Sequence, residues 1–433
     1  MGSPLLRTAR HALASAAPFL LLAVATAPLH AQPAPLSLDE ALGIAQNNAP
    51  ALTAASSGAQ AARELAVAAG QLPDPVLRVG VENLPADGAD RFRIANDFMT
   101  MRRVGVMQEY VPADKRDLLR RRALLDATRQ DATRLRLTAD LRRDVAIAWF
   151  DRYYAVKSRQ ILKTLEAETE LQIRTLDSQL RAGKASAGES AMASAGLLQV
   201  QDRMLMADKQ ERLAQIALSR WLGKDAAREP GAAPDIGALA MDPANPDVGA
   251  AAPAVREHEN EREVAQAELA VARSNKKPNW SWELAYSVRG SAFSNMVSFG
   301  VSIPLTFNSA NRQDREVAAK QAQLEQAHAL HEDMQREAQA TVASSYAEWQ
   351  SLIARRKRLA DALLPVARQR IELALAAYRG GQGNLAAVLE ARRADVEAQL
   401  QLLDLEREAA RLWAQLRYVY ADAAASHGAG SHQ

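Results

Sequence analysis

Few residues in this sequence have the types and the spacing that metal binding requires. His328 and His331 are three residues apart, so on a helix both imidazoles could face one ion. His427 and His432 lie in a tail rich in glycine, serine and alanine, and no carboxylate completes either histidine pair. Three methionines could contact soft cations, although packing is the expected role of Met99, Met101 and Met107. We therefore expect no metal site and no bound cofactor.

The composition excludes several further kinds of chemistry. The 433 residues include no cysteine, which excludes disulfides, thiolate metal sites and cysteine nucleophiles. The sequence contains no serine–histidine–aspartate motif, phosphate-binding glycine loop or metalloprotease helix. Lys and Arg number 53 against 51 Asp and Glu, and this net charge of +2 gives no reason to expect a nucleic acid partner. The sequence predicts a protein that is not an enzyme.

The N-terminus has the layout of a secretory signal, which we predict over residues 1–31. Arg7 and Arg10 precede an apolar stretch, and Ala31 offers a small residue before a cleavage point. An N-terminal membrane anchor is the alternative, although Pro18 interrupts the apolar stretch. We expect the mature chain to lie outside the cytoplasm. No later window approaches the roughly 20 apolar residues of a membrane helix, so we expect strands to make any membrane crossing.

Four short segments alternate between an apolar and a polar face. Every second side chain is apolar in residues 280–289 and 296–305, and residues 77–82 and 103–110 repeat the pattern with one polar break at Gln108. This alternation is typical of strands with lipid on one side and water on the other. The predicted lipid-facing residues include Trp280, Trp282, Leu284, Tyr286, Val297, Phe299, Val301 and Ile303. A soluble sandwich, whose strands also alternate, is the alternative.

The number of strands requires several chains to cooperate. Single-chain outer-membrane barrels begin at about eight strands, and four strands cannot enclose a lumen. Open sheet edges are not tolerated in lipid, because their backbone groups would lack hydrogen-bond partners. We therefore expect several copies to share one barrel. The hairpin tips, residues 83–101 and 290–295, should then face outside the cell.

Very long helices are predicted next to these strands. Residues 113–182 and 310–379 are rich in Ala, Leu, Arg, Glu and Gln and nearly free of Gly and Pro. At a rise of 1.5 Å per residue, about 70 residues span on the order of 100 Å, far more than one compact core. Pro365 interrupts only the second stretch, where we expect a kink or a change of packing. Returning helices are predicted over 189–222 and 385–421. The helices alone fit a soluble coiled coil equally well.

The two halves of the chain repeat one layout. Arg181-Ala182-Gly183 resembles Arg379-Gly380-Gly381, and Leu218-Ser219-Arg220-Trp221 resembles Leu416-Arg417-Tyr418-Val419, both at an offset of 198 residues. The predicted domains are a signal peptide at 1–31, a first repeat at 32–223, a linker or irregular collar at 224–252, a second repeat at 253–423 and a flexible tail at 424–433.

The whole pattern resembles the TolC family of outer-membrane efflux proteins. Residues 36–42 and 48–50, the glycine turns at Gly183 and Gly381, and the strand end at 303–307 carry this resemblance over the mature chain. It implies a mainly α fold with a membrane β portion. A long α-helical barrel would join a trimeric twelve-stranded β-barrel, to which each chain adds four β-strands.

One segment narrows the resemblance within that family. Residues 72–110 are most similar to the heavy-metal branch (CzcC/CusC-like), which works with proton-driven tripartite pumps. Many close relatives carry a lipidated N-terminal cysteine, which this chain lacks.

In this family the turns that end the long helices form a periplasmic tip. The residues expected to meet the periplasmic adaptor are Gly183, Lys184, Ser186, Gly381, Gln382, Gly383 and Asn384. The resemblance places the closing residues of the pore aperture at Glu189, Tyr378 and Glu390. Another family acid falls on Ala387 and a family arginine on Gly383, so the closing network should be weaker or differently built. Ordinary solvated positions for the two glutamates are the alternative.

These expectations combine into one function. We expect an outer-membrane exit duct of a tripartite efflux pump that exports heavy-metal cations and extends into the periplasm. Its partners would be two further copies in a homotrimer, a periplasmic adaptor, an inner-membrane RND-type pump and outer-membrane lipid. The alternatives are an outer-membrane component of drug efflux or of type I protein secretion, and a soluble periplasmic coiled-coil adaptor.

Overall fold

The computed structural model describes residues 34–183 and 185–425, and from Pro35 onward the described chain is a single compact unit. The predicted signal peptide and Lys184 lie outside the described residues, as do His427 and His432. Helical structure continues through residue 425, which lies inside the predicted tail.

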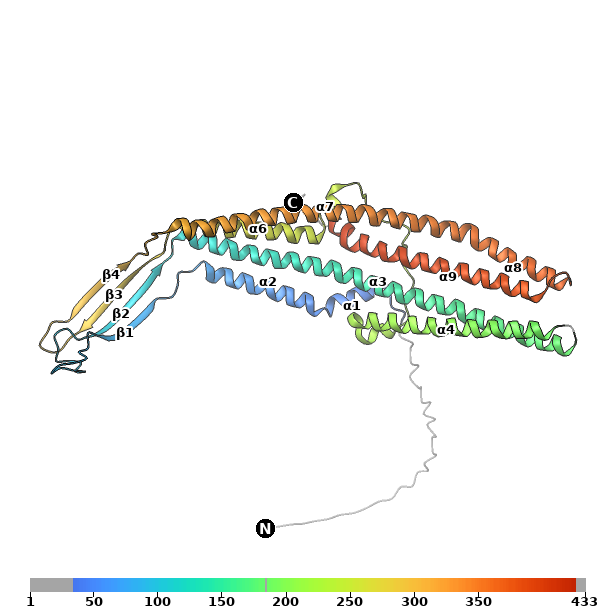
Figure 1. Cartoon of the computed structure of the whole chain (residues 1–433), viewed down its shortest axis with the longest axis horizontal. Helices are drawn as coiled ribbons and strands as arrows, with labels where there is room; N and C mark the ends of the chain where they lie inside the picture. Colours follow the sequence, from blue (N-terminus) through green and yellow to red (C-terminus); the bar gives the residue numbers. More distant parts are fainter. Residues whose placement is uncertain (1–33, 184, 426–433) are drawn as a thin grey trace, which may run out of the picture. The chain divides into compact units, whose positions relative to one another are not determined.

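The elements follow the same order in each half of the chain (Figure 1). The first half contains α1 (Leu38–Asn47), α2 (Pro50–Ala69), β1 (Val76–Glu82), β2 (Met101–Tyr110), α3 (Ala113–Arg181) and α4 (Ala187–Leu222). The second half contains α5 (Pro246–Ala250), α6 (Pro253–Ser274), β3 (Trp280–Val288), β4 (Met296–Ser302), α7 (Gln313–Arg358), α8 (Leu364–Arg379) and α9 (Leu385–Gln415). The predicted mainly α fold with four antiparallel strands is confirmed.

The four strands form one antiparallel sheet in the order β1-β2-β3-β4. The two hairpins are joined through β2 and β3, where Tyr110 lies opposite Trp280 and Val104 opposite Tyr286. β4 ends at Ser302, short of the predicted 305, because Pro304 has no N–H to donate to a ladder. The sheet therefore unites the two repeats.

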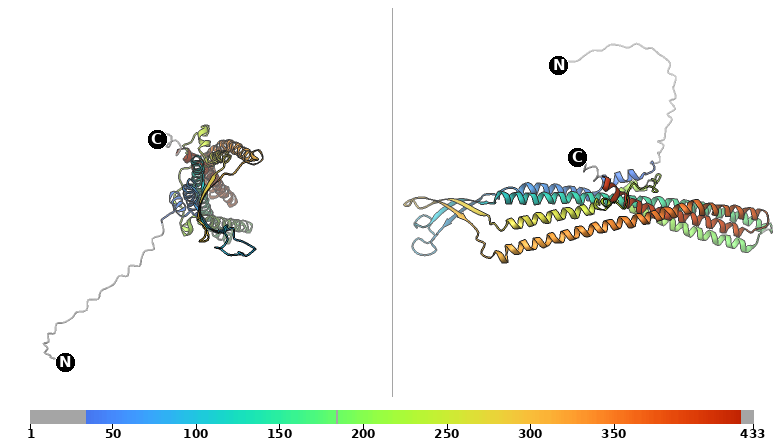
Figure 2. Two further views of the ribbon diagram at one scale, coloured as in Figure 1. Left: turned by 90° about the vertical axis from the view of Figure 1, so that its left-hand side faces the viewer. Right: turned by 90° about the horizontal axis from the view of Figure 1, so that it is seen from above.

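The helices continue the strands at one end and form hairpins at the other. Next to the sheet the helices pack in the order α2-α3-α6-α7. This order matches that of the strands, because α2 precedes β1, α3 follows β2, α6 precedes β3 and α7 follows β4. Farther from the sheet the order becomes α4-α3-α9-α8, and the α3–α4 and α8–α9 turns lie at the end opposite the sheet (Figures 1 and 2). The predicted long helices are confirmed, with α3 extending over 69 residues.

The main core lies where the helices of both repeats meet. Trp149 is fully buried and donates its indole N–H to the Leu36 carbonyl oxygen at 3.0 Å. Trp349 donates in the same way to the Ile236 carbonyl oxygen at 3.2 Å, and each donor lies 113 residues after its acceptor. The same tertiary bond thus recurs in both repeats.

The segment between the repeats wraps around this core. Its backbone carbonyls accept hydrogen bonds from buried side chains, including Trp413 Nε1 to Ala238 at 3.1 Å and Arg152 Nη2 to Ala227 at 3.2 Å. Val248 and Ile236 are buried in the core. These contacts hold the segment against the helices.

Pro365 changes the helical register before it, as well as ending α7. A π-helical turn spans Leu359–Leu363, and the N–H of Leu364 bonds to the carbonyl of Leu359, five residues back. Proline lacks the N–H for the i−4 bond and its ring crowds that carbonyl, so the preceding turn widens. A second π-helical turn spans Leu416–Ala421.

Over the parts of the chain that the structure describes, no helix combines the length and the apolar character needed to cross a membrane.

Candidate functional site

The first candidate site is the sheet, which has one apolar and one polar face. On the apolar face, cross-strand neighbours form two continuous rows: Leu77, Val106, Leu284 and Phe299, then Val79, Val104, Tyr286 and Val297. All eight side chains are exposed, from 40% at Val106 to 71% at Val79 and Val297. Rows of this kind normally pack against a core, and here no element of the described chain covers them.

The predicted lipid-facing residues divide into two groups. Leu284, Tyr286, Val297, Phe299, Val301 and Ile303 are exposed large apolar residues, although Ile303 lies just beyond the end of β4. Trp280 and Trp282 are half-buried, and the ring of Trp280 lies 5.0 Å from that of Tyr110. Gln108, the polar break on this face, is satisfied because its amide donates to the Pro73 carbonyl at 2.6 Å.

The sheet ends where its two hairpin tips contact each other. Arg289 donates through Nε to the Phe98 carbonyl oxygen at 3.0 Å, and the Phe98 and Phe293 rings lie 6.5 Å apart. Thr100 is fully buried and donates its hydroxyl to the Asn83 carbonyl oxygen. The β1–β2 loop is therefore tied to the β3–β4 turn.

The second candidate site is the pair of turns that connect the long helices. Gly183 and Gly381 adopt φ of 70° and 71°, a left-handed conformation that glycine adopts without strain. Ser186 caps α4 and Asn384 caps α9 through side-chain oxygens that accept backbone N–H groups. The N–H of Gln382 bonds to the Ala377 carbonyl at 2.9 Å. Both turns are thus defined by local backbone chemistry.

Gly383 lies in a crowded part of its turn. An added Cβ there would lie 3.1 Å from the Cβ of Ala377 and 3.2 Å from the backbone nitrogen of Tyr378. An arginine at position 383, where the family resemblance places one, would therefore require its neighbours in the turn to shift by a few tenths of an ångström.

Tyr378 connects the two helical hairpins near the turns. Its hydroxyl donates to Oε1 of Gln179 at 2.8 Å, which joins α8 to α3. Gln179 was missed by sequence reasoning, although it lies 199 residues before Tyr378 and the repeat offset of 198 places both at the same level.

Glu189 makes its hydrogen bonds within its own helix turn. Its carboxylate accepts from the backbone N–H and the hydroxyl of Ser186, at 2.8 and 3.0 Å, in a capping box. These bonds to the Ser186 backbone and side chain lower the pKa of Glu189 below its ordinary value. The carboxylate therefore stays charged at neutral pH and fixes the start of α4.

Glu390 pairs with a neighbouring helix and lies close to Glu189. Arg370 of α8 donates to it at 2.8 Å, and both side chains are more than half exposed. The structure brings Glu189 and Glu390 to the wall of one cavity of about 190 Å³, which Arg393 also lines. Tyr378 is not part of this wall, so the structure brings two of the three predicted aperture residues to one cavity and leaves Tyr378 outside it.

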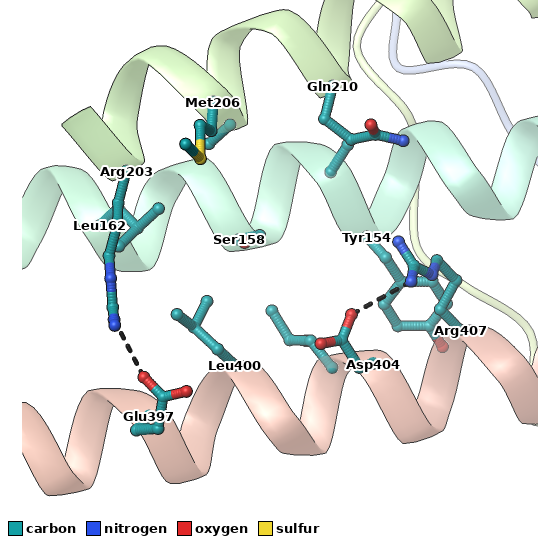
Figure 3. Close-up of a pocket in the computed structure, with 13 residues that line it drawn as sticks. Tyr154, Ser158, Leu162, Arg203, Met206, Gln210, Glu397, Leu400, Asp404 and Arg407 are labelled. Carbon is teal, nitrogen blue, oxygen red and sulfur yellow. Dashed lines mark hydrogen bonds and ion pairs between the residues drawn. The ribbon is translucent and has the colours of Figure 1, made fainter.

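Two larger cavities lie between α4 and α9, and the smaller of the two shares Glu390 and Arg393 with the 190 Å³ cavity. They measure about 280 and 420 Å³, and Arg203 and Glu397 line both. These two side chains form an ion pair at 2.9 Å between the two helices (Figure 3). The lining of the 420 Å³ cavity mixes charged and apolar groups, including Tyr154, Met206, Asp404 and Arg407. It shows no converging set of catalytic side chains.

The two histidines on α7 do not converge on an ion. His328 is exposed, whereas His331 faces α6 with Nε2 3.2 Å from Oε2 of Glu259. Within residues 34–183 and 185–425, no three His, Cys, Asp or Glu residues gather as a metal site would require.

Residues 247–420 match the family model of outer membrane efflux proteins. The match begins in α5 and ends in the second π-helical turn, so it covers the second repeat. No curated protein matches the chain.

Solved structures extend the comparison to both repeats. A membrane protein from Pseudomonas aeruginosa superposes with a TM-score of 0.75 at 20% identity, covering 88% of this chain and 90% of its own. CusC gives 0.74 at 18%, with 88% and 92% covered, and VceC from Vibrio cholerae gives 0.71 at 17%, with 88% and 95% covered. At these identities the likeness shows the fold, which is that of outer-membrane channels.

Proposed function

We propose that this chain is the outer-membrane exit duct of a tripartite efflux pump. One observation carries the proposal: a sheet with exposed apolar rows on one face and charged or small residues on the other. In a bilayer the apolar rows would contact lipid and the polar face would contact water. The family match of the second repeat supports the same function.

The sheet requires other copies to close it. Among the described strands, β1 and β4 each pair on one side only, and an open edge would be costly in lipid. Three copies would supply twelve strands, the number that the family resemblance implies. We propose a homotrimer on this basis.

The helices carry surfaces that suit such an assembly. Six large apolar side chains of α4 are exposed: Met192, Leu198, Leu205, Met206, Leu213 and Ile216. Beside the π-helical turn, Leu359, Leu363, Val366 and Leu405 line a mostly apolar groove of about 470 Å³. Burial of these surfaces between copies would build an α-helical barrel below the sheet.

The remaining partners follow from the position of the turns. In the trimer the α3–α4 and α8–α9 turns would form the periplasmic tip and meet the adaptor, which links the duct to an inner-membrane pump. The Tyr378–Gln179 hydrogen bond would hold the aperture closed. Glu189 would stabilise one turn, and Glu390 would place three carboxylates near the opening.

A direct experiment tests the duct. The purified chain is reconstituted in planar bilayers, and its location is determined by separating inner from outer membranes. We expect discrete channel openings and recovery in the outer membrane. Recovery of a monomer in the soluble periplasmic fraction, with no conductance, would favour a soluble adaptor instead.

We propose heavy-metal cations as the cargo, on the resemblance of residues 72–110 to the heavy-metal branch. A strain that lacks this chain should become sensitive to zinc, cobalt, cadmium, copper or silver. Sensitivity to dyes with unchanged metal tolerance would show a drug-efflux role and leave the duct itself intact.

A further inference from the structure

A connected set of charges crosses three strands on the polar face of the sheet. Arg78 of β1 and Arg103 of β2 both donate to Glu283 of β3, at 3.4 and 3.1 Å. Arg103 also donates to Glu82 of β1 at 2.9 Å. Glu283 is therefore the carboxylate that the two arginines share. We refer to these four residues as the charge bridge.

The small residues Gly105 and Ala285 leave room for both arginines to reach Glu283. Gly105 lies opposite Arg78 on one side and opposite Ala285 on the other. With no side chain at Gly105, the Arg78 guanidinium can extend across β2 to reach Glu283. A Cβ at Gly105 would lie 2.9 Å from the Cβ of Ala285, so the position admits only glycine unless the strands shift.

The charge bridge is neutral as a whole, and Glu283 is its least exposed member. The Glu283 side chain is 19% exposed and that of Arg103 is 25%, against 54% for Arg78 and 44% for Glu82. Two guanidinium groups meet two carboxylates. Loss of the Glu283 charge would leave two arginines and one carboxylate, a net charge of about +1. Loss of the Arg78 charge would leave one arginine and two carboxylates, a net charge of about −1.

We propose that Glu283 is a specificity-determining residue of the duct, because it cancels the positive charge of Arg78 and Arg103 on the lumen wall. This inference rests on the proposed function, in which the polar face lines the water path. A fixed charge on a wall acts on ions within a Debye length, about 8 Å at physiological salt. In a trimer each uncompensated charge would occur three times, in one ring around the lumen that we call the belt.

Ion selectivity in planar bilayers tests this role. The reversal potential is measured across a KCl gradient for the full-length chain and four variants. We expect Glu283→Gln to lower the potassium-to-chloride permeability ratio about twofold or more, because the belt gains net positive charge. Arg78→Gln should raise the ratio. Glu283→Asp keeps the charge and should retain the parental ratio, and Glu64→Gln controls for a charge change at an exposed acid on α2.

The outcomes separate the two proposals. Absence of channels from the unmodified chain would overturn the duct itself. Channels with the same ratio in Glu283→Gln as in the unmodified chain would leave the duct standing and overturn the role of Glu283. If Glu283→Gln fails to assemble, Arg78→Gln decides alone, and an unchanged or lowered ratio in that variant overturns the inference.

Discussion

At the scale of single residues, two polar side chains near the helical turns make different kinds of contact. Tyr378 and Gln179 connect two helical hairpins through one hydrogen bond, whereas Glu189 makes its bonds within one turn. Such a difference matters for opening. A bond between hairpins must break when the hairpins separate, but a capping box can move with its helix as a unit.

The first prediction concerns this hydrogen bond. Tyr378→Phe removes the donor and should shift the balance toward the open aperture by about 1 kcal/mol, roughly a fivefold increase in open probability in bilayer recordings. Gln179→Ala should act in the same direction, and the double variant should add little because both remove one interaction. Tyr346→Phe removes a hydroxyl from a partly buried tyrosine that packs against the central core, and it is the matched control. Equal open probability of Tyr378→Phe and the unmodified chain would contradict the assignment of Tyr378 to the aperture.

At the scale of elements, charged side chains hold the helices that support the sheet. Glu268 of α6 accepts from Arg122 of α3 at 3.0 Å and from Lys320 of α7 at 2.7 Å. Burial acts to raise the pKa of Glu268, but the hydrogen bonds and charges of Lys320 and Arg122 outweigh it and lower the pKa below 4.5. The ion pairs therefore stabilise the fold above pH 4.5, and this contribution is lost as pH falls through the lowered pKa.

The second prediction follows from that pH dependence. Glu268→Gln should lower the free energy of unfolding by about 1 kcal/mol at pH 7, since solvent partly screens these ion pairs. The difference from the unmodified chain should shrink as the pH falls through the lowered pKa of Glu268. Denaturant unfolding in detergent over a series of pH values measures it. A difference that keeps the same size at every acidic pH would show that the ion pairs are not its source.

The third prediction concerns the two faces of β4. Phe299 lies in an apolar row and its neighbour Ser298 points to the polar face. Phe299→Arg should reduce membrane insertion, because an arginine facing lipid near the bilayer midplane costs about 2–4 kcal/mol. Ser298→Arg introduces the same charge toward water and should insert. The amount of each variant in the outer membrane fraction provides the measurement, and equal recovery would contradict the assignment of faces.

At the scale of the whole molecule, assembly must cover surfaces that a single chain leaves exposed. Leu205 is 70% exposed in the middle of α4, and Phe299 and Val297 are exposed to the same degree on the sheet. One surface lies on the helices and the other on the strands. Contact between copies would cover the first, and lipid would cover the second.

The fourth prediction tests assembly. Leu205→Asp should convert the trimer into smaller species in detergent, because each buried leucine contributes about 1.5–3 kcal/mol and is lost in every interface. Leu205→Met nearly conserves volume and should retain the trimer. Light scattering coupled to size-exclusion chromatography determines the mass. A trimer of unchanged stability in Leu205→Asp would exclude this face of α4 from the interface.

The amino-acid sequence by itself determined the strands, the long helices and the repeat. These features depend on residues that are close together in the chain, so they can be recognised without a structure. Examples are the alternation over 280–289 and the scarcity of Gly and Pro over 113–182. Pro365 likewise predicted an interruption of one helix. The sequence did not predict that the interruption would be a π-helical turn.

Only the tertiary structure decided which side chains meet across elements. The partner of Tyr378 is Gln179 and not a carboxylate, and Arg78 reaches Glu283 across Gly105 on a different strand. Such pairs depend on the rotation and axial position of packed helices and on the register of paired strands. Those quantities are set by the packing of the whole chain, because no local pattern specifies how far one helix lies along another.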